Sequence, residues 1–338
     1  MKRSTLIFVL ACALLLSALG VHETLIHNRQ TNTDTLSLAL DWTPNTNHTG
    51  IYVALSKGWY KDAGINLKIL PYSSSVTPDQ LVASGKADLG ISSTEQVVAD
   101  SGAGSPVVSI AAIAAHNTSV LAVTKASGIT SPAQLEGKIY GGFGSPFETP
   151  EISAVIRHAG GNGNFQNVTL GVDPLEALKS KQVNFVWVFS GWEVIQAKRE
   201  GLALTTFPIS SYGVPDYSTP NIITSANTIA SKQAQLQKFM SATIRGYNYA
   251  TAHPSQAAQV LLSSVPAGTF PDPGLVEQSQ AYLSNHYQDP RSSWGVQTSS
   301  SWQNYTKFML DNHGIFDASG KPITSLNANS LYSNQFVE

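Results

Sequence analysis

Cysteine is nearly absent from this chain, since its 338 residues include only Cys12. A single thiol forms no disulfide within the chain and supplies no cysteine-based metal site. Charge is scarce as well: Asp, Glu, Lys and Arg make up 12% of the residues, against roughly 25% in an average globular protein. With a net charge of -2 and no basic tract, the sequence gives no reason to expect nucleic acid as a partner.

Sequence signatures of catalysis are missing too. The eight histidines show no metal-ligand spacing and no HExxH motif. There is no GxSxG nucleophile elbow and no GxGxxG dinucleotide fingerprint. We therefore expect no catalytic residue, no metal and no cofactor, and we do not expect an enzyme. The 42% hydrophobic content can fill a sizeable core, and the length suggests about two domains.

The N-terminus has the pattern of an export signal. Lys2 and Arg3 precede an apolar run from Leu6 to Leu19, which is the order of regions in a secretory leader. Small residues predict cleavage after Gly20, so that residues 1–20 form the leader. The run is also near the lower limit for a membrane-spanning helix, so its retention as an anchor is the alternative.

Two further expectations concern this end of the chain. Cys12 lies inside the apolar run, which leaves lipid attachment open as a third alternative. Residues 21–34 are polar and featureless, and we read them as a linker. The protein is therefore expected in the periplasm or at the outer face of the cytoplasmic membrane.

From Leu36 onward, strand-like and helix-like stretches alternate in two successive units. This order predicts an α/β protein with parallel sheets covered by helices on both faces. We expect one lobe from residues 35–124 and 222–338, and a second lobe from 125–221. The chain would cross between them near Lys125 and near Asn221, and these two strands would form the hinge.

Several polar and aromatic residues lie at or shortly after the carboxyl ends of the predicted strands. Open parallel sheets bind ligands beyond those ends, and crevices between lobes are preferred ligand sites. If the two units face each other, the residues converge on one cleft. The predicted ligand contacts are Trp42, Asn45, Asn47, His48, Ser92, His116, Phe143, Ser145, Glu148, Phe189, Trp192 and Glu193.

Each group has a functional and a structural interpretation. Trp42 can stack on a flat ring or lie in the core, and Asn47 can bind a ligand or cap a helix. The glycine-rich turn at 140–148 lets a ligand approach the backbone, but it lacks the Lys-Ser/Thr of a phosphate-binding loop. Glu193 can accept hydrogen bonds from an amino group or a protonated ring nitrogen. A lone histidine such as His116 is often structural.

Three stretches resemble a known family: LDWTPNTNHTGIYVA at 40–54, ITSPAQLEGKIYGGFGSPFE at 129–148 and WVFSGWEVIQAKREG at 187–201. The chain resembles the substrate-binding proteins of bacterial importers for thiamine pyrimidine precursors. The wider group includes sulfonate-binding proteins and the eukaryotic pyrimidine synthase of thiamine biosynthesis.

The resemblance implies a periplasmic-binding-protein type II fold, with two Rossmann-like lobes joined by a two-strand hinge. It implies a monomer that binds a small aromatic heterocycle, a 4-amino-2-methylpyrimidine with a 5-aminomethyl-type substituent that is often N-formylated. An ABC permease in the membrane would be the partner. The matching positions are Trp42, Asn45, Asn47, Ser145, Glu148, Trp192 and Glu193.

The chain also departs from these relatives. Members of the importer branch commonly carry a lipid-modified cysteine after the leader, and this chain has none there. The eukaryotic synthase has a cysteine-rich segment with an active histidine, and this chain lacks such a segment. Two alternatives stay open: a binding protein for another flat heterocycle such as riboflavin, and an enzyme that makes or modifies the pyrimidine.

Overall fold

The computed structural model describes residues 34–73, 75–105 and 107–337. The predicted leader, Cys12 and linker residues 21–33 lie outside the described residues, so cleavage, anchoring and lipid attachment stay predictions. Among the described helices, none is both long and apolar enough to cross a membrane. No group of three or more His, Cys, Asp or Glu side chains in the described part of the chain is arranged to hold a metal ion.

The first sheet has five strands in the order β2-β1-β3-β10-β4. β1 runs parallel to β3, with Leu38 opposite Leu89. β10 runs antiparallel to both β3 and β4. The strands are β1 (Asp34–Ala39), β2 (Ile65–Leu70), β3 (Leu89–Ser92), β4 (Val107–Ala112) and β10 (Asn221–Ser225).

The second sheet repeats this arrangement in the order β7-β6-β8-β5-β9. β6 is parallel to β7 and β8, whereas β5 is antiparallel to β8 and β9. Each sheet therefore contains one antiparallel strand, where the sequence predicted parallel strands. The strands are β5 (Ser119–Thr124), β6 (Ile139–Gly142), β7 (Gln166–Thr169), β8 (Phe185–Phe189) and β9 (Leu204–Pro208).

The chain passes between the sheets through two connections, residues 113–118 and residues 209–220. The sequence predicted that residues 119–124 belong to the first lobe and that the first crossing lies near Lys125. Instead, β5 pairs with β8 and β9, so the crossing comes before Ser119. A buried apolar strand looks the same in either sheet, and its hydrophobic pattern does not say which one it joins. The division into two moving lobes stays a prediction.

Two helices next to the first sheet are packed closely against each other. Helix α2 (Thr49–Ser56) lies against the long helix α9 (Ala226–Ala252). A Cβ atom added at Gly50 would lie 2.3 Å from the ring of Tyr247, and one at Gly246 would lie 2.0 Å from the carbonyl oxygen of Gly50. Only glycine at both positions lets the two helices approach this closely.

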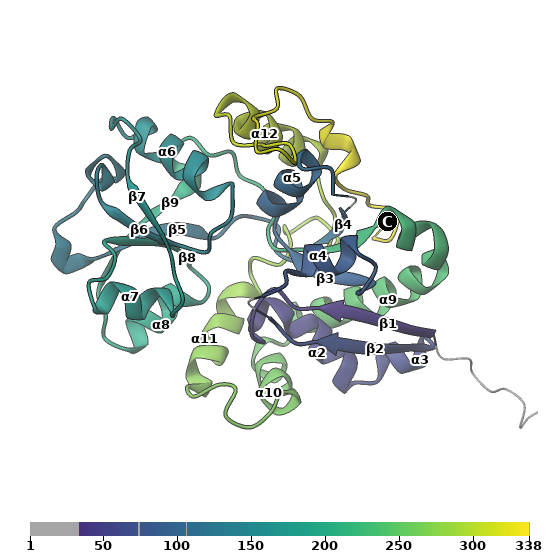
Figure 1. Cartoon of the computed structure of the whole chain (residues 1–338). Helices are drawn as coiled ribbons and strands as arrows, with labels where there is room; N and C mark the ends of the chain where they lie inside the picture. The colour runs from purple at the N-terminus through teal and green to yellow at the C-terminus, as the bar shows by residue number, and fades with distance from the viewer. Residues whose placement is uncertain (1–33, 74, 106, 338) are drawn as a thin grey trace, which may run out of the picture. The chain divides into compact units, whose positions relative to one another are not determined.

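Helices also cover both faces of the second sheet. Figure 1 shows α6 (Glu148–His158) on one face, with α7 (Pro174–Lys179) and α8 (Glu193–Arg199) on the other. The remaining helices are α3 (Trp59–Asp62), α4 (Pro78–Ala83), α5 (Thr94–Gly102), α10 (Pro254–Ser264), α11 (Pro273–Leu283), α12 (Ser299–Asp311), and the short η1 (Thr46–His48), η2 (Lys125–Ser127), η3 (Pro132–Leu135), η4 (Ile209–Tyr212) and η5 (Ala328–Ser330).

A buried cluster of two carboxyl groups and two phenols joins four segments of the chain. Tyr217, in the second crossing, donates to Glu95 of α5 at 2.7 Å and lies 3.4 Å from Glu151 of α6. Tyr305 of α12 donates to Glu151 at 2.7 Å. Burial raises the pKa of Glu95, and burial together with the nearby charge of Glu95 raises the pKa of Glu151. The cluster therefore ties helices next to both sheets to one of the two connections.

Candidate functional site

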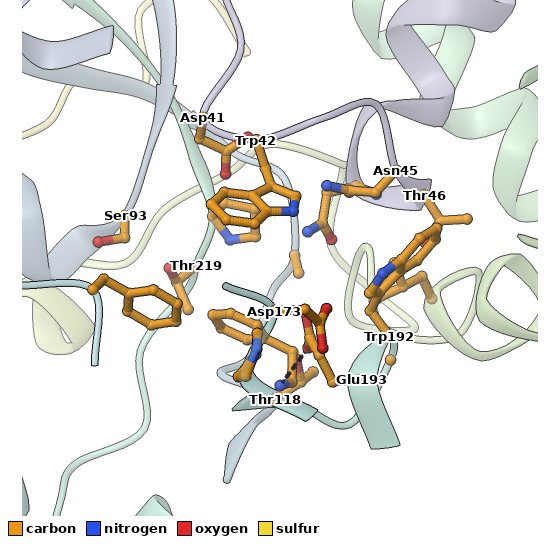
Figure 2. Close-up of a pocket in the computed structure, with 18 residues that line it drawn as sticks. Asp41, Trp42, Asn45, Thr46, Ser93, Thr118, Asp173, Trp192, Glu193 and Thr219 are labelled. Carbon is orange, nitrogen blue, oxygen red and sulfur yellow. Dashed lines mark hydrogen bonds between the residues drawn. The ribbon is translucent and has the colours of Figure 1, made fainter. Parts of the chain in front are cut away.

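A cavity of about 230 Å³ lies where the carboxyl ends of strands from both sheets meet. Such edges are the usual ligand sites of open α/β sheets. In the first sheet, the segment after β1 and Ser93 after β3 line the cavity. In the second sheet, the segments after β6 and β8 line it (Figure 2). The cavity is lined by the predicted contact residues Trp42, Asn45, Asn47, Phe143, Phe189, Trp192 and Glu193.

Aromatic side chains form much of the cavity wall. Trp42 is 41% exposed and Phe143 is 48% exposed, and they are the exposed Trp and Phe side chains of the described chain. The indole of Trp42 packs against the ring of Tyr72, with 4.7 Å between ring centroids. Phe189 and Trp192 add aromatic surface from the second sheet. Large exposed aromatic surfaces favour an apolar or flat partner.

The loop that carries Trp42 is shaped by its own polar side chains. Asn45 caps η1: its Oδ1 accepts the N–H of Asn47 at 2.9 Å, and its Nδ2 donates to the Thr43 carbonyl at 3.2 Å. The buried ring of His48 accepts the Asn45 N–H at Nδ1, so the proton of a neutral ring lies on Nε2 and is donated to Asp41 Oδ1 at 2.8 Å. Both side chains therefore hold the loop, and His48 does not line the cavity.

Three carboxyl groups face the cavity from different segments: Asp41, Asp173 and Glu193. Glu193 Oε2 accepts the Phe189 N–H at 2.9 Å. Burial, together with the charge of Asp173, raises the pKa of Glu193 to about 7. Asp173 Oδ1 caps α7 by accepting the N–H groups of Leu175 and Glu176 at 2.8 and 3.2 Å. Among the described residues, no Lys, Arg or His lines this cavity.

Asp41 stands beside Trp42 after the first predicted strand, so the sequence indicates it as a candidate at the same strand end. Asp173 was not predicted from the sequence. Asp173 precedes Pro174, the ordinary pattern of a helix N-cap, and nothing in that pattern distinguishes a cap that also borders a cavity.

Glu148 is fully buried and shapes the glycine-rich turn instead of lining the cavity. Its Oε1 accepts the Tyr140 hydroxyl at 2.6 Å and the Phe143 N–H at 2.9 Å, and its Oε2 accepts the N–H groups of Gly144 and Ser145 at 2.8 Å. The carboxylate thereby sets the backbone position of Phe143. Its effect on a ligand would be indirect.

Ser92 and Ser145 border a neighbouring hollow of about 270 Å³, which shares Trp42 and Phe143 with the main cavity. Ser92 donates to the buried Asp79 at 2.5 Å. Its neighbour Ser93 lines the main cavity. Ser93 borders both spaces, whereas Ser92 borders the neighbouring hollow and not the main cavity.

His116 lies away from the cavity, on the first connection between the sheets. It is hydrogen-bonded to Asp216 of the second connection and, at 2.8 Å through Nε2, to Asp289 after α11. The imidazole therefore joins both connections to the C-terminal part of the chain, and the structure does not bring it together with the other predicted contacts.

The comparisons with known proteins agree with this architecture. The sequence model of the family described as NMT1/THI5 like matches residues 45–257. The formylaminopyrimidine-binding protein of Halalkalibacterium halodurans is 28% identical over 84% of this chain and 89% of its own length. The 4-amino-5-hydroxymethyl-2-methylpyrimidine phosphate synthase of Aspergillus parasiticus is 24% identical over 90% of this chain and 88% of its own.

Among solved structures, the alkanesulfonate-binding protein SsuA from Xanthomonas axonopodis pv. citri, bound to MOPS, is similar with a TM-score of 0.67. It is 13% identical and covers 88% of this chain and 98% of its own. At that identity the similarity concerns the fold alone. With two sheets of the same strand order and two connections, the fold is the type II periplasmic-binding-protein fold that the family resemblance implied.

Proposed function

The chain belongs to the NMT1/THI5-like family, and from this premise we propose that it is the solute-binding component of an ABC importer for a thiamine pyrimidine precursor. The observation that carries the proposal is the cavity itself. It combines exposed aromatic faces with amide and carboxylate groups contributed from both sheets.

A flat pyrimidine fits the aromatic walls. The indole of Trp42 comes from the first sheet, and Phe143, Phe189 and Trp192 come from the second. Stacking on such side chains is favourable for any planar ring. The volume of about 230 Å³ is below the roughly 300–1,000 Å³ of pockets for drug-sized ligands, and a single small ring is in keeping with that size.

The polar groups of the cavity suit the amino substituent of the ring. Glu193 and Asp173 present carboxyl oxygens that accept hydrogen bonds, and Thr118 and Thr219 add hydroxyl groups (Figure 2). A 4-aminopyrimidine supplies N–H donors for the carboxyl groups, and its ring nitrogens accept from hydroxyl groups. A relative that is 28% identical over most of both chains is named for binding a formylaminopyrimidine.

Capture would proceed by closure of two lobes around the ligand. The connections 113–118 and 209–220 are the only links in the described chain between consecutive strands of different sheets, and a hinge motion there would bring the walls of the cavity together. The ligand would shift the population toward the closed form, which the permease recognises at the outer face of the membrane.

Titration calorimetry with single-ring pyrimidines tests this function. We expect a 4-amino-2-methylpyrimidine with a 5-aminomethyl-type or 5-hydroxymethyl substituent to bind and to raise the melting temperature. Riboflavin and methanesulfonate are the comparison ligands. Binding of either in place of the pyrimidines would contradict the proposal.

The fungal synthase relative makes an enzyme the second candidate. The same incubations distinguish the two, because a binding protein returns its ligand chemically unchanged. Mass spectrometry of the recovered pyrimidine should show the original mass. A new product that forms in proportion to protein and time would favour the enzyme.

A further inference from the structure

We infer that the cavity selects a pyrimidine that carries a positive charge, namely one with a free aminomethyl group present as an ammonium, over N-formylated and phosphorylated forms. This inference rests on the proposed function, since it names the substituent of the ligand that the same cavity would bind.

Two of the three carboxyl groups of the cavity lie together on one side of it. Figure 2 shows Asp173 and Glu193 next to each other, across the cavity from the indole of Trp42, with Asp41 beside that indole. Asp173 also acts on the pKa of Glu193 through its charge, so these two groups are electrostatically close. An ammonium between them would relieve the repulsion between two like charges.

The described lining offers no cation to balance these groups. Among the described residues, His48 is the basic side chain hydrogen-bonded to one of them, Asp41, and it accepts the N–H of Asn45 at Nδ1. A ring that accepts at one nitrogen is neutral. The ionisable side chains of the described lining are therefore all acidic, which gives the cavity a negative potential.

The helix ends at the cavity do not offset this potential. The N-terminus of a helix attracts anions unless its own side chains occupy it. Asp173 is the N-cap of α7, and Glu193 lies in the first turn of α8. A phosphate or sulfonate would meet these carboxylates in place of free N–H groups.

The chemistry of the substituent then decides the order of affinity. An ammonium offers three N–H donors and a charge, and hydrogen bonds between charged partners are about twice as strong as neutral ones. N-formylation removes the charge, leaves one N–H and adds a carbonyl oxygen that competes with the carboxylates as an acceptor. A phosphate ester adds negative charge to a negative cavity.

The test is a titration at pH 7.5 of four ligands that share one ring. They are 4-amino-2-methylpyrimidines with 5-aminomethyl, 5-(formylaminomethyl), 5-hydroxymethyl and 5-phosphooxymethyl substituents. We expect the aminomethyl compound to bind at least about tenfold more tightly than the formyl and hydroxymethyl compounds, and the phosphate ester to bind most weakly.

Two variants assign the preference to the carboxyl groups. In Glu193→Gln the aminomethyl affinity should fall at least about tenfold. The hydroxymethyl affinity should change less than about threefold, because the glutamine oxygen still accepts a hydrogen bond from the neutral amino group of the ring. Asp173→Asn should act in the same direction, because asparagine still caps α7. The matched control is Glu200→Gln, at the other end of α8, where the carboxylate pairs with Lys179; it should change neither affinity.

The outcomes separate the inference from the proposed function. If the formyl or phosphate compound binds as tightly as the amine or more tightly, the inference is overturned and the proposed function stands. An unchanged preference in both Glu193→Gln and Asp173→Asn overturns it as well. If no pyrimidine binds to the wild-type protein, the proposed function fails and the inference fails with it.

Discussion

The phenol of Tyr247 donates a hydrogen bond to the carbonyl oxygen of Asn47 at 2.6 Å, although 200 positions separate the two residues. The ring of Tyr247 is buried and stacks on Trp294, with 4.0 Å between centroids. Tyr287 donates in the same way to the carbonyl of Thr46 at 2.5 Å. The loop that presents Trp42 is thus positioned by the C-terminal third of the chain.

Replacing Tyr247 with phenylalanine should therefore weaken ligand binding without touching the cavity. The variant removes one buried hydrogen bond, and we expect a loss of about 1 kcal/mol in the free energy of unfolding. Affinity for the aminomethylpyrimidine should fall several-fold, measured by calorimetry. Tyr249→Phe is the control, because its ring lies on the same helix and contacts Lys57. Equal affinities for Tyr247→Phe and wild type would show that this bond does not position the loop.

Glu148→Gln tests whether the buried carboxylate holds the glycine-rich turn. The amide that replaces it has one acceptor oxygen and an NH₂ group that opposes backbone N–H donors. We expect the free energy of unfolding to drop by about 2–3 kcal/mol and the affinity to fall through displacement of Phe143. Urea unfolding and calorimetry measure the two effects. The exposed Glu176→Gln serves as control, and a fully stable Glu148→Gln protein would contradict the assignment.

The contacts of the Glu148 side chain could not be predicted from the sequence. The segment around 140–148 indicated a strand, a glycine turn and a helix, and the structure has them as β6 and α6. The pattern also drew attention to Glu148. A carboxylate in the first turn of a helix can face a ligand or bind the backbone of the preceding turn. Which of the two occurs depends on the backbone conformation of that turn, and the hydrophobic periodicity of the sequence does not show it.

The paired carboxyl groups of Glu95 and Glu151 predict a pH-dependent stability. Burial raises the pKa of both, so the folded state holds protons that the unfolded state releases above its ordinary pKa. Their stabilising contribution is complete below that ordinary pKa and is lost as pH rises through the raised value. The free energy of unfolding should therefore decline with pH, by up to about 1.4 kcal/mol per pH unit for each proton.

Glu151→Gln isolates this effect, because the amide oxygen still accepts from Tyr305 but does not ionise. The free energy of unfolding of the variant should decline less with rising pH than that of wild type, and the variant should be more stable than wild type at pH 8. Urea unfolding at pH 5, 6.5 and 8 measures it. The expectation fails if wild type and variant show parallel pH profiles.

Glu193 predicts that proton release accompanies binding. Burial, reinforced by Asp173, raises its pKa to about 7, so near neutral pH a large share of the group is protonated in the free protein. A bound ammonium favours the ionised form. Affinity for the aminomethylpyrimidine should rise as pH increases through about 7, with roughly half a proton released per ligand at pH 7. Calorimetry in buffers of different ionisation enthalpy counts the protons. Glu193→Gln should abolish the release, and its persistence would assign it to another group.

The site itself was predictable in part, because its residues stand at strand ends, where the fold class places ligands. Trp42 and Glu193 were found in this way, and both line the cavity. His116 lies outside the cavity, and strand-end reasoning does not distinguish a ligand loop from a connection between sheets. The first crossing was misplaced for a related reason, since β5 and the strands of the first sheet share one apolar pattern.

A crystal structure of the protein with a 4-amino-2-methylpyrimidine bound would show directly whether the cavity is the ligand site. We predict the ring in the cavity, with one face against the indole of Trp42 and the other against aromatic side chains of the second sheet. The amino substituent should lie within about 3.2 Å of a carboxyl oxygen of Glu193. A ring bound elsewhere, or one in the cavity with no contact to Trp42 or Glu193, would show that these residues do not form the binding site.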